Sequence, residues 1–202
     1  MINIRTIKTA YKSLSSIDFT RKIINSLIRI GHISFLSKFR TIFYFKSNHV
    51  KLGKNVSLLG SCYSLNLGRD INIYNNCVFE LGQDSNLEIG SKVIFSFGCI
   101  VSINKSLKIG DFVQIGEYCS IRDTTHDYKE NGKPMMNNND ISQPIIIGNN
   151  VWIGRNCLIM PGTIIEDGVV IGANSLVKGR LRSQLIYAGN PIKEIQARPT
   201  TL

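Results

Sequence analysis

The sequence is poor in histidine and tryptophan and lacks a long apolar run. Its 202 residues include three histidines and one tryptophan, so few side chains can supply imidazole or indole chemistry. No apolar stretch is long enough to cross a bilayer, and the N-terminus lacks the apolar core and small-residue cleavage site of a signal peptide. We therefore expect a cytoplasmic protein with one good-sized domain and an extension.

Acidic residues are nearly absent from the first quarter of the chain. Residues 1–54 hold eleven Lys and Arg against the single acid Asp18, so 11 − 1 = +10 accounts for the entire net charge of +10. The remainder is neutral, which argues against nucleic-acid binding by the main domain. Residues 1–51 thus form a basic extension, with apolar residues at near-helical spacing over residues 17–33. This extension either caps the main domain or associates peripherally with the inner face of a membrane through residues 1–50.

An apolar residue recurs every six positions through most of the remaining chain. The best run comprises Ile147, Ile153, Ile159, Ile165, Ile171 and Val177, and earlier runs comprise Leu67, Ile73, Phe79, then Ile89, Phe95, Val101, then Ile109, Ile115, Ile121. Six is neither the helical period of 3.6 nor the strand period of 2. A sustained period of six predicts short strands joined by tight turns, wound as a solenoid with three strands per coil. We predict an all-β parallel β-helix over residues 52–202, ending in a short tail at residues 178–202.

One long segment interrupts this repeat. Residues 122–146 exceed what a coil can hold, and we interpret them as a long loop of the kind that usually carries function. The five cysteines each follow an apolar anchor by four positions, which predicts one column of small buried side chains. Their odd number and a reducing compartment favour free thiols over a disulfide frame or a metal site. The cysteines are Cys62, Cys77, Cys99, Cys119 and Cys157.

Three stretches of the repeat region carry a recognisable pattern: I-G-N-N-V-W-I at residues 147–153, P-G-T-I-I-E-D-G-V-V-I-G-A-N-S-L-V at 161–177 and A-G-N-P at 188–191. Together they resemble the hexapeptide-repeat acyltransferases. The resemblance covers about Leu52 to Ile195, and the family includes maltose and galactoside acetyltransferases and capsule and lipopolysaccharide O-acetyltransferases. It implies a left-handed coil, a homotrimer with active sites between subunits, and acetyl-CoA as co-substrate. We expect no metal, because catalytic zinc generally needs three protein ligands and the repeat domain offers one histidine.

The long loop carries T-T-H-D-Y at residues 124–128. His126 is the one histidine outside the extension and resembles the family's loop histidine, which implies the role of general base. We expect Asp123 to fix its tautomer, with Asp127, Glu117 or a backbone carbonyl as alternatives. Trp152 resembles the tryptophan of the family's O-acetyltransferases, so we expect it to line the acceptor site and to offer its N–H to the oxyanion.

The resemblance also places the coenzyme. Its pantetheine is expected beside small residues of the last coils, which permit close approach: Gly154, Gly172 and Ala173. Lys178, Arg180 and Arg198 are then the candidates for the phosphates. Family members often carry Thr-Lys after the last coil, whereas Gly179 and Arg180 follow Lys178 here.

These residues favour transfer of acetyl from acetyl-CoA to a sugar hydroxyl, in bacterial capsule or lipopolysaccharide. N-acetylation of an amino sugar or nucleotide-amino sugar uses the same machinery and stays open. So does acetylation of a small molecule such as an antibiotic. The alternative outside the enzymes is a non-catalytic solenoid scaffold, which predicts that His126 is dispensable.

Overall fold

The computed structural model describes residues 50–60, 62–129 and 134–199. The predicted basic extension therefore lies almost wholly outside the described residues, and its capping or membrane role stays a prediction. Within the described ranges, no helix is long and apolar enough to cross a membrane.

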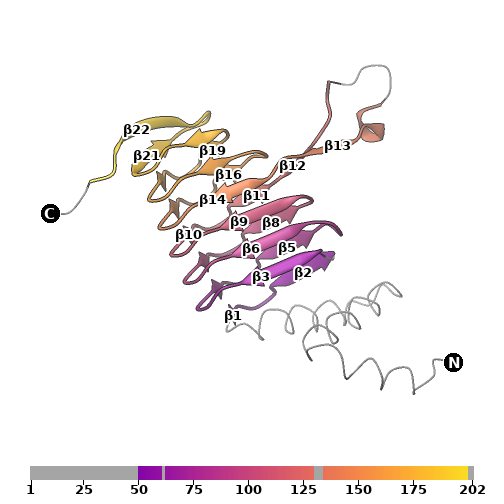
Figure 1. Ribbon diagram of the computed structural model, residues 1–202, viewed down its shortest axis with the longest axis horizontal. Coiled ribbons are helices and arrows are strands. Elements are labelled where there is room, and N and C mark those ends of the chain that lie inside the picture. The colour runs from indigo at the N-terminus through magenta and orange to yellow at the C-terminus, as the bar shows by residue number, and fades with distance from the viewer. Residues whose placement is uncertain (1–49, 61, 130–133, 200–202) are drawn as a thin grey trace.

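Short parallel strands stack into three long sheets that form a solenoid (Figure 1). The first sheet contains β1 (Lys51–Leu52), β4 (Asn72–Ile73), β7 (Ile94–Phe95), β10 (Gln114–Ile115), β15 (Trp152–Ile153), β18 (Val170–Ile171), β21 (Leu185–Ala188) and the antiparallel β22 (Lys193–Ala197). The second sheet contains β2 (Ser57–Gly60), β5 (Val78–Leu81), β8 (Ile100–Ile103), β11 (Ser120–Arg122), β16 (Leu158–Ile159) and β19 (Leu176–Val177). The third contains β3 (Ser64–Leu67), β6 (Asn86–Ile89), β9 (Ser106–Ile109), β14 (Ile145–Ile147), β17 (Ile164–Ile165) and β20 (Arg180–Leu181).

The period of six arises because each successive apolar anchor faces the interior from the next sheet. Ile109, Ile115 and Ile121 lie on β9, β10 and β11, one strand of each sheet, and all three are buried. Their equivalents in neighbouring coils pair in register, as Ile115 does with Ile153. The core is therefore a stack of aliphatic layers, and the prediction of a parallel β-helix is confirmed.

Four of the five cysteines form a buried column along the corner after the first sheet. Each thiol donates a hydrogen bond to a carbonyl of the next coil, for example Cys119 to Gly154 at 3.1 Å. A hydrogen bond to the Cys77 thiol and burial raise the pKa of Cys99, so that thiol stays neutral in the folded protein. Cys62 is outside this column, contrary to the prediction, because its anchor Leu58 lies on β2 of the second sheet.

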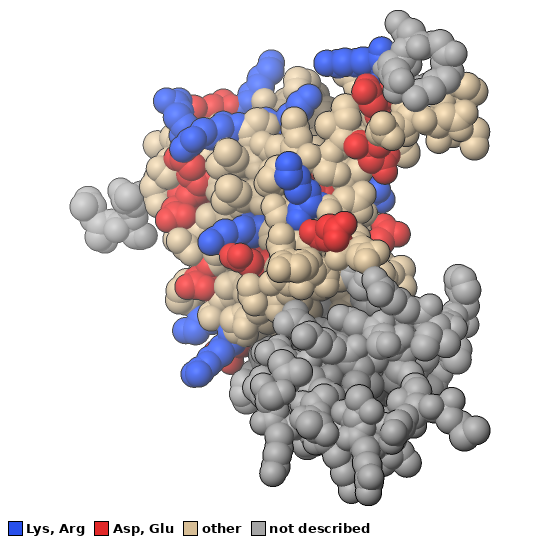
Figure 2. Space-filling view, turned by 45° about the vertical axis from the view of Figure 1, so that its right-hand side comes forward, with Lys and Arg blue, Asp and Glu red and all other residues tan. Residues whose placement is uncertain are grey.

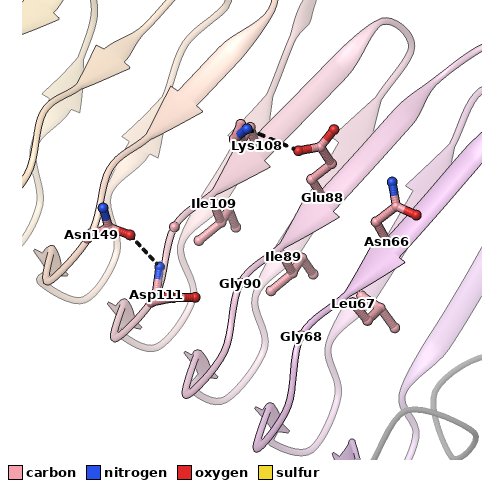
Figure 3. A pocket seen from close by; sticks show the side chains of 11 residues that line it. Asn66, Leu67, Gly68, Glu88, Ile89, Gly90, Lys108, Ile109, Asp111 and Asn149 are labelled. Atoms are coloured by element: carbon pink, nitrogen blue, oxygen red, sulfur yellow. Dashed lines mark hydrogen bonds and ion pairs between the residues drawn. The ribbon is translucent and has the colours of Figure 1, made fainter.

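A ladder of side-chain oxygens holds the corner between the third and first sheets (Figure 3). The backbone N–H of Asp111 donates to the Asn149 Oδ1 of the next coil at 2.8 Å, and the N–H of Ser91 donates to Asp111 Oδ1 at 2.7 Å. A Cβ on Gly110 would lie 2.5 Å from Asn149 Oδ1. Glycine is needed there because the ladder leaves no room for a side chain. The shallow hollow of about 420 Å³ in Figure 3 follows this corner.

The segment predicted as a loop leaves the solenoid as an arm (Figure 1). It contains the antiparallel strands β12 (Thr124–His126) and β13 (Asp140–Ser142) and the 3-10 turn η1 (Met135–Asn137). The chain rejoins the coil at β14, which pairs with β9. The arm is thus an insertion between two strands that would otherwise follow each other in one coil.

The residues predicted as a C-terminal tail extend the solenoid before leaving it. β20 pairs with β17 and β21 pairs with β18, and they bury Leu181 and Tyr187. The six-residue spacing fails between Val177 and Leu181, which are four positions apart, because a shorter corner connects these strands.

Candidate active site

The arm brings His126 and Asp140 together as a cross-strand pair. They are direct partners in the β12–β13 register, the geometry in which facing side chains of antiparallel strands touch. His126 Nδ1 lies 2.7 Å from Asp140 Oδ1. A proton on Nδ1 donated to this carboxylate leaves the Nε2 lone pair available. The imidazole side chain is 76% exposed, so Nε2 can reach a substrate.

Asp123 does not occupy the predicted position beside His126. It is fully buried, and its carboxylate accepts the backbone N–H groups of Asn104, Lys105 and Ser106 at 2.8, 2.6 and 2.9 Å. The Thr124 hydroxyl donates to it as well, at 2.7 Å. Asp123 therefore fixes the corner between β8 and β9, and the prediction that it orients the histidine is wrong.

The alternative acids are also engaged or remote. Asp127 Oδ1 accepts the N–H of Lys129 at 2.9 Å, and Glu117 lies at the corner after β10 and lines a different hollow. The residue that the sequence analysis missed is Asp140, fourteen positions after His126. Only the register of the hairpin could have indicated it.

A hollow of about 510 Å³ lies between the arm and the second sheet. Its walls come from β5, β8, β11 and both arm strands, and His126 and Asp140 stand at its edge. Most of the side chains that line it are polar or charged. They include Glu80, Ser102, Asn104, Arg122, Thr124 and Thr125.

A second groove, of about 460 Å³, runs over the outer face of the first sheet. The structure brings together four residues that the sequence analysis assigned to acceptor or coenzyme: Trp152, Gly154, Gly172 and Ala173. The floor is tight, because a Cβ on Gly154 would lie 2.6 Å from the Ala173 backbone nitrogen. Trp152 is 56% exposed, so its indole is available to a ligand.

None of the three predicted phosphate ligands lines this groove. Arg198 Nη1 donates instead to the backbone carbonyls of Asn150 and Gly168, at 3.2 and 3.1 Å. Arg180 Nε donates to Glu166 Oε1 at 2.6 Å, and this hydrogen bond, with that from the Ser183 N–H, lowers the pKa of Glu166. Lys178 is exposed after β19 and is not among the lining residues. The groove does contain a cation that the sequence analysis missed, Arg155, two positions after the buried anchor Ile153.

The two hollows are separate in one protomer. Among the described residues, none lines both, because the first is on the second sheet and the other is on the first sheet. His126 and Trp152 therefore do not share a pocket within a single chain.

Comparison with known proteins gives concordant matches. The family model "Bacterial transferase hexapeptide (six repeats)" matches residues 144–179. The putative lipopolysaccharide biosynthesis O-acetyl transferase WbbJ of Escherichia coli is 33% identical over 150 residues, covering 67% of this chain and 75% of that protein. A probable acetyltransferase of Mycobacterium tuberculosis, Rv3034c, is 28% identical over 74% of this chain, and the match spans only 50% of its length.

A solved structure matches in both sequence and fold. A point mutant of AntD, an N-acyltransferase from Bacillus cereus in complex with dTDP and coenzyme A, has a TM-score of 0.57 at 26% identity. The match covers 76% of this chain and 87% of that one. One third of the aligned residues are identical across three quarters of WbbJ, and the six-residue repeat is present in both the sequence and the structure. The chain therefore belongs to the hexapeptide-repeat family of acyltransferases and is folded as a left-handed parallel β-helix.

Proposed function

We propose that this protein is an acetyl-CoA-dependent O-acetyltransferase that modifies a sugar hydroxyl of a bacterial surface polysaccharide, capsule or lipopolysaccharide. The observation that carries the proposal is the 2.7 Å contact between His126 Nδ1 and Asp140 Oδ1 at the edge of a polar hollow. An oriented imidazole with a free Nε2 is the arrangement that general-base catalysis requires. The similarity to WbbJ supports a polysaccharide acceptor.

The reaction follows from this geometry. Nε2 of His126 takes the proton of the acceptor hydroxyl while the oxygen forms a bond to the thioester carbonyl carbon. The resulting imidazolium is stabilised by the Asp140 carboxylate. When the tetrahedral intermediate collapses, the carbon–sulfur bond breaks, the thiolate takes the proton from His126, and the products are an acetyl ester and free coenzyme A. The indole N–H of Trp152 or a backbone N–H is the proposed donor to the oxyanion.

The groove over the first sheet is the proposed coenzyme site. Gly154, Gly172 and Ala173 give it a wall without bulky side chains, along which a pantetheine arm can lie close to the backbone. Arg155 is the cation available there for a phosphate. Because His126 and Trp152 line different hollows, we infer that the His126 arm of one chain faces the groove of another in a homotrimer.

Transfer to nitrogen is the second candidate, and the similarity to AntD favours it. In that case the acceptor is an amino sugar or a nucleotide-linked amino sugar, and the product is an amide. A protonated amine would need a base for its extra proton, and an acid to bind it. The exposed arm acids do not distinguish the two acceptors, so the acceptor must be tested directly.

The test is release of the coenzyme A thiol from acetyl-CoA against neutral sugars, acidic sugars, amino sugars and bacterial oligosaccharides. We expect hydroxyl-dependent release by the native protein and its loss in His126→Ala. Asp127→Asn is the matched control, because the Asp127 carboxylate accepts the Lys129 N–H whereas His126 pairs with Asp140, so this change should leave the rate within about twofold. Release that requires an amine would support the second candidate. No acceptor-dependent release, together with no coenzyme binding, would refute both and leave a scaffold.

A further inference from the structure

A column of polar side chains crosses the floor of the hollow under the arm. Glu80 on β5, Ser102 on β8 and Arg122 on β11 are in register on three adjacent strands of the second sheet, and all three line the hollow. Neighbouring strands are about 4.8 Å apart, so the backbones of Glu80 and Arg122 are separated by roughly 10 Å. The column therefore has an acidic end and a basic end, and the basic end adjoins the arm.

The two acids that line this hollow already have partners. Ser102 Oγ donates to Glu80 Oε2 at 3.0 Å, and Asp140 Oδ1 holds His126. Arg122, by contrast, has no hydrogen-bond acceptor and no ion-pair partner within the described part of the chain, although a guanidinium carries five N–H donors. Figure 2 shows basic and acidic side chains interspersed over the face of the solenoid that it presents. Two carboxylates and one arginine thus line the hollow, and Arg122 is the lining cation whose guanidinium is left without a partner among the described residues.

We propose that Arg122 binds an anionic substituent of the acceptor, a carboxylate or a phosphate, and that the acceptor is therefore an acidic sugar. This inference rests on the proposed function for the reaction and goes further by naming the class of acceptor. A planar guanidinium matches either anion with two parallel hydrogen bonds. Glu80 repels the same anion at the far end, and its carboxylate and the Ser102 oxygen accept hydrogen bonds from sugar hydroxyls. The column therefore orients the acceptor with its acidic group next to His126.

The experiment compares acceptors that differ only in charge. Methyl glycosides of glucose, galactose and mannose are tested beside their uronic acids and their 6-phosphates, by thiol release at saturating acetyl-CoA. We expect at least one acidic sugar to have a KM roughly tenfold or more below that of its neutral parent, with the carboxylate and phosphate series separating the two anions. Arg122→Gln should abolish that difference, because the KM for the acidic sugar should rise to that of its neutral parent.

Arg69→Gln is the matched control. Arg69 is an exposed arginine at the corner after β3, and it does not line the hollow, so its replacement should leave every KM unchanged. Equal loss for neutral and acidic sugars in Arg122→Gln, or no preference for acidic sugars in the native protein, would overturn the proposal.

Direct binding separates this inference from the proposed function. Calorimetric titration of the native protein with each uronic acid and sugar phosphate needs no turnover. If an acidic sugar binds the native protein but not Arg122→Gln, the anion site is supported even where no acetyl transfer occurs. In that case the proposed reaction is wrong and the anion site is not. Absence of binding by every acidic sugar would overturn the anion site even where transfer to a neutral sugar is observed.

Discussion

Replacing Asp123 by alanine should destabilise the solenoid without removing the acid–base pair. The Asp123 carboxylate accepts three backbone N–H groups at the corner between β8 and β9 and also the Thr124 hydroxyl. A hydrogen bond to a charged group contributes about 1.5–3 kcal/mol, and water can reach part of this corner once the carboxylate is gone. We therefore expect Asp123→Ala to lower the free energy of unfolding by about 3–5 kcal/mol.

The assay is urea unfolding followed by circular dichroism, with Asp140→Ala as the matched control. The Asp140 side chain is 46% exposed and its one polar partner among the described side chains is His126, so its loss should change stability by no more than about 0.5 kcal/mol. The two variants should thus separate effects on stability from effects on catalysis. Asp123→Ala should unfold at a lower urea concentration, whereas Asp140→Ala should keep the native midpoint but transfer acetyl slowly. An unchanged midpoint for Asp123→Ala would show that the corner does not depend on this carboxylate and would refute the assignment.

Three further outcomes follow from particular contacts. Gly110→Ala should lower the free energy of unfolding by about 2 kcal/mol or more, because its Cβ would collide with the next coil. Gly179→Ala, with no atom within 4 Å of the added Cβ at φ +87°, should lower it by about 1 kcal/mol. Thermal melts that rank the two variants the other way would contradict the close packing of the ladder at Gly110. The raised pKa of Cys99 contributes stability that is complete below the unfolded pKa of about 8.5 and is lost as pH rises above it. Cys99→Ala should therefore reduce the fall of the unfolding free energy at alkaline pH by up to about 1.4 kcal/mol per pH unit, measured by urea unfolding at several pH values. An unchanged slope would argue against a neutral buried thiol. Arg155→Gln should raise the KM for acetyl-CoA roughly tenfold, whereas Arg180→Gln should leave it unchanged. An unchanged KM in Arg155→Gln would show that the coenzyme phosphates lie outside the groove.

The fold could be predicted because its signal repeats. Each coil must place one apolar side chain inward from each sheet, so the spacing of Ile109, Ile115 and Ile121 reveals the period. The same spacing recurs in further coils, which strengthens the signal. The prediction failed where one instance was interpreted alone. Cys62 fits the four-residue offset from Leu58, but that anchor belongs to a different sheet, and the offset carries no information about which corner follows.

The site could be predicted only in part. His126 was identifiable because so few histidines exist, and the small residues of the groove were identifiable through the resemblance. Asp123 is near His126 in sequence, but it lies at the bend between β11 and β12, where the chain leaves the solenoid. Its carboxylate accordingly faces the corner, whereas Asp140 reaches the imidazole through the pairing of two arm strands, which no local pattern encodes.

The most direct test of the central claim is steady-state acetyl transfer by His126→Gln and Asp140→Asn, measured beside coenzyme A affinity. If the pair is the general base and its orienting acid, His126→Gln should lower kcat by about 10²–10⁴-fold and Asp140→Asn by a smaller factor, both with native affinity for coenzyme A. Undiminished transfer in His126→Gln, or loss of coenzyme binding in step with loss of transfer, would contradict the account.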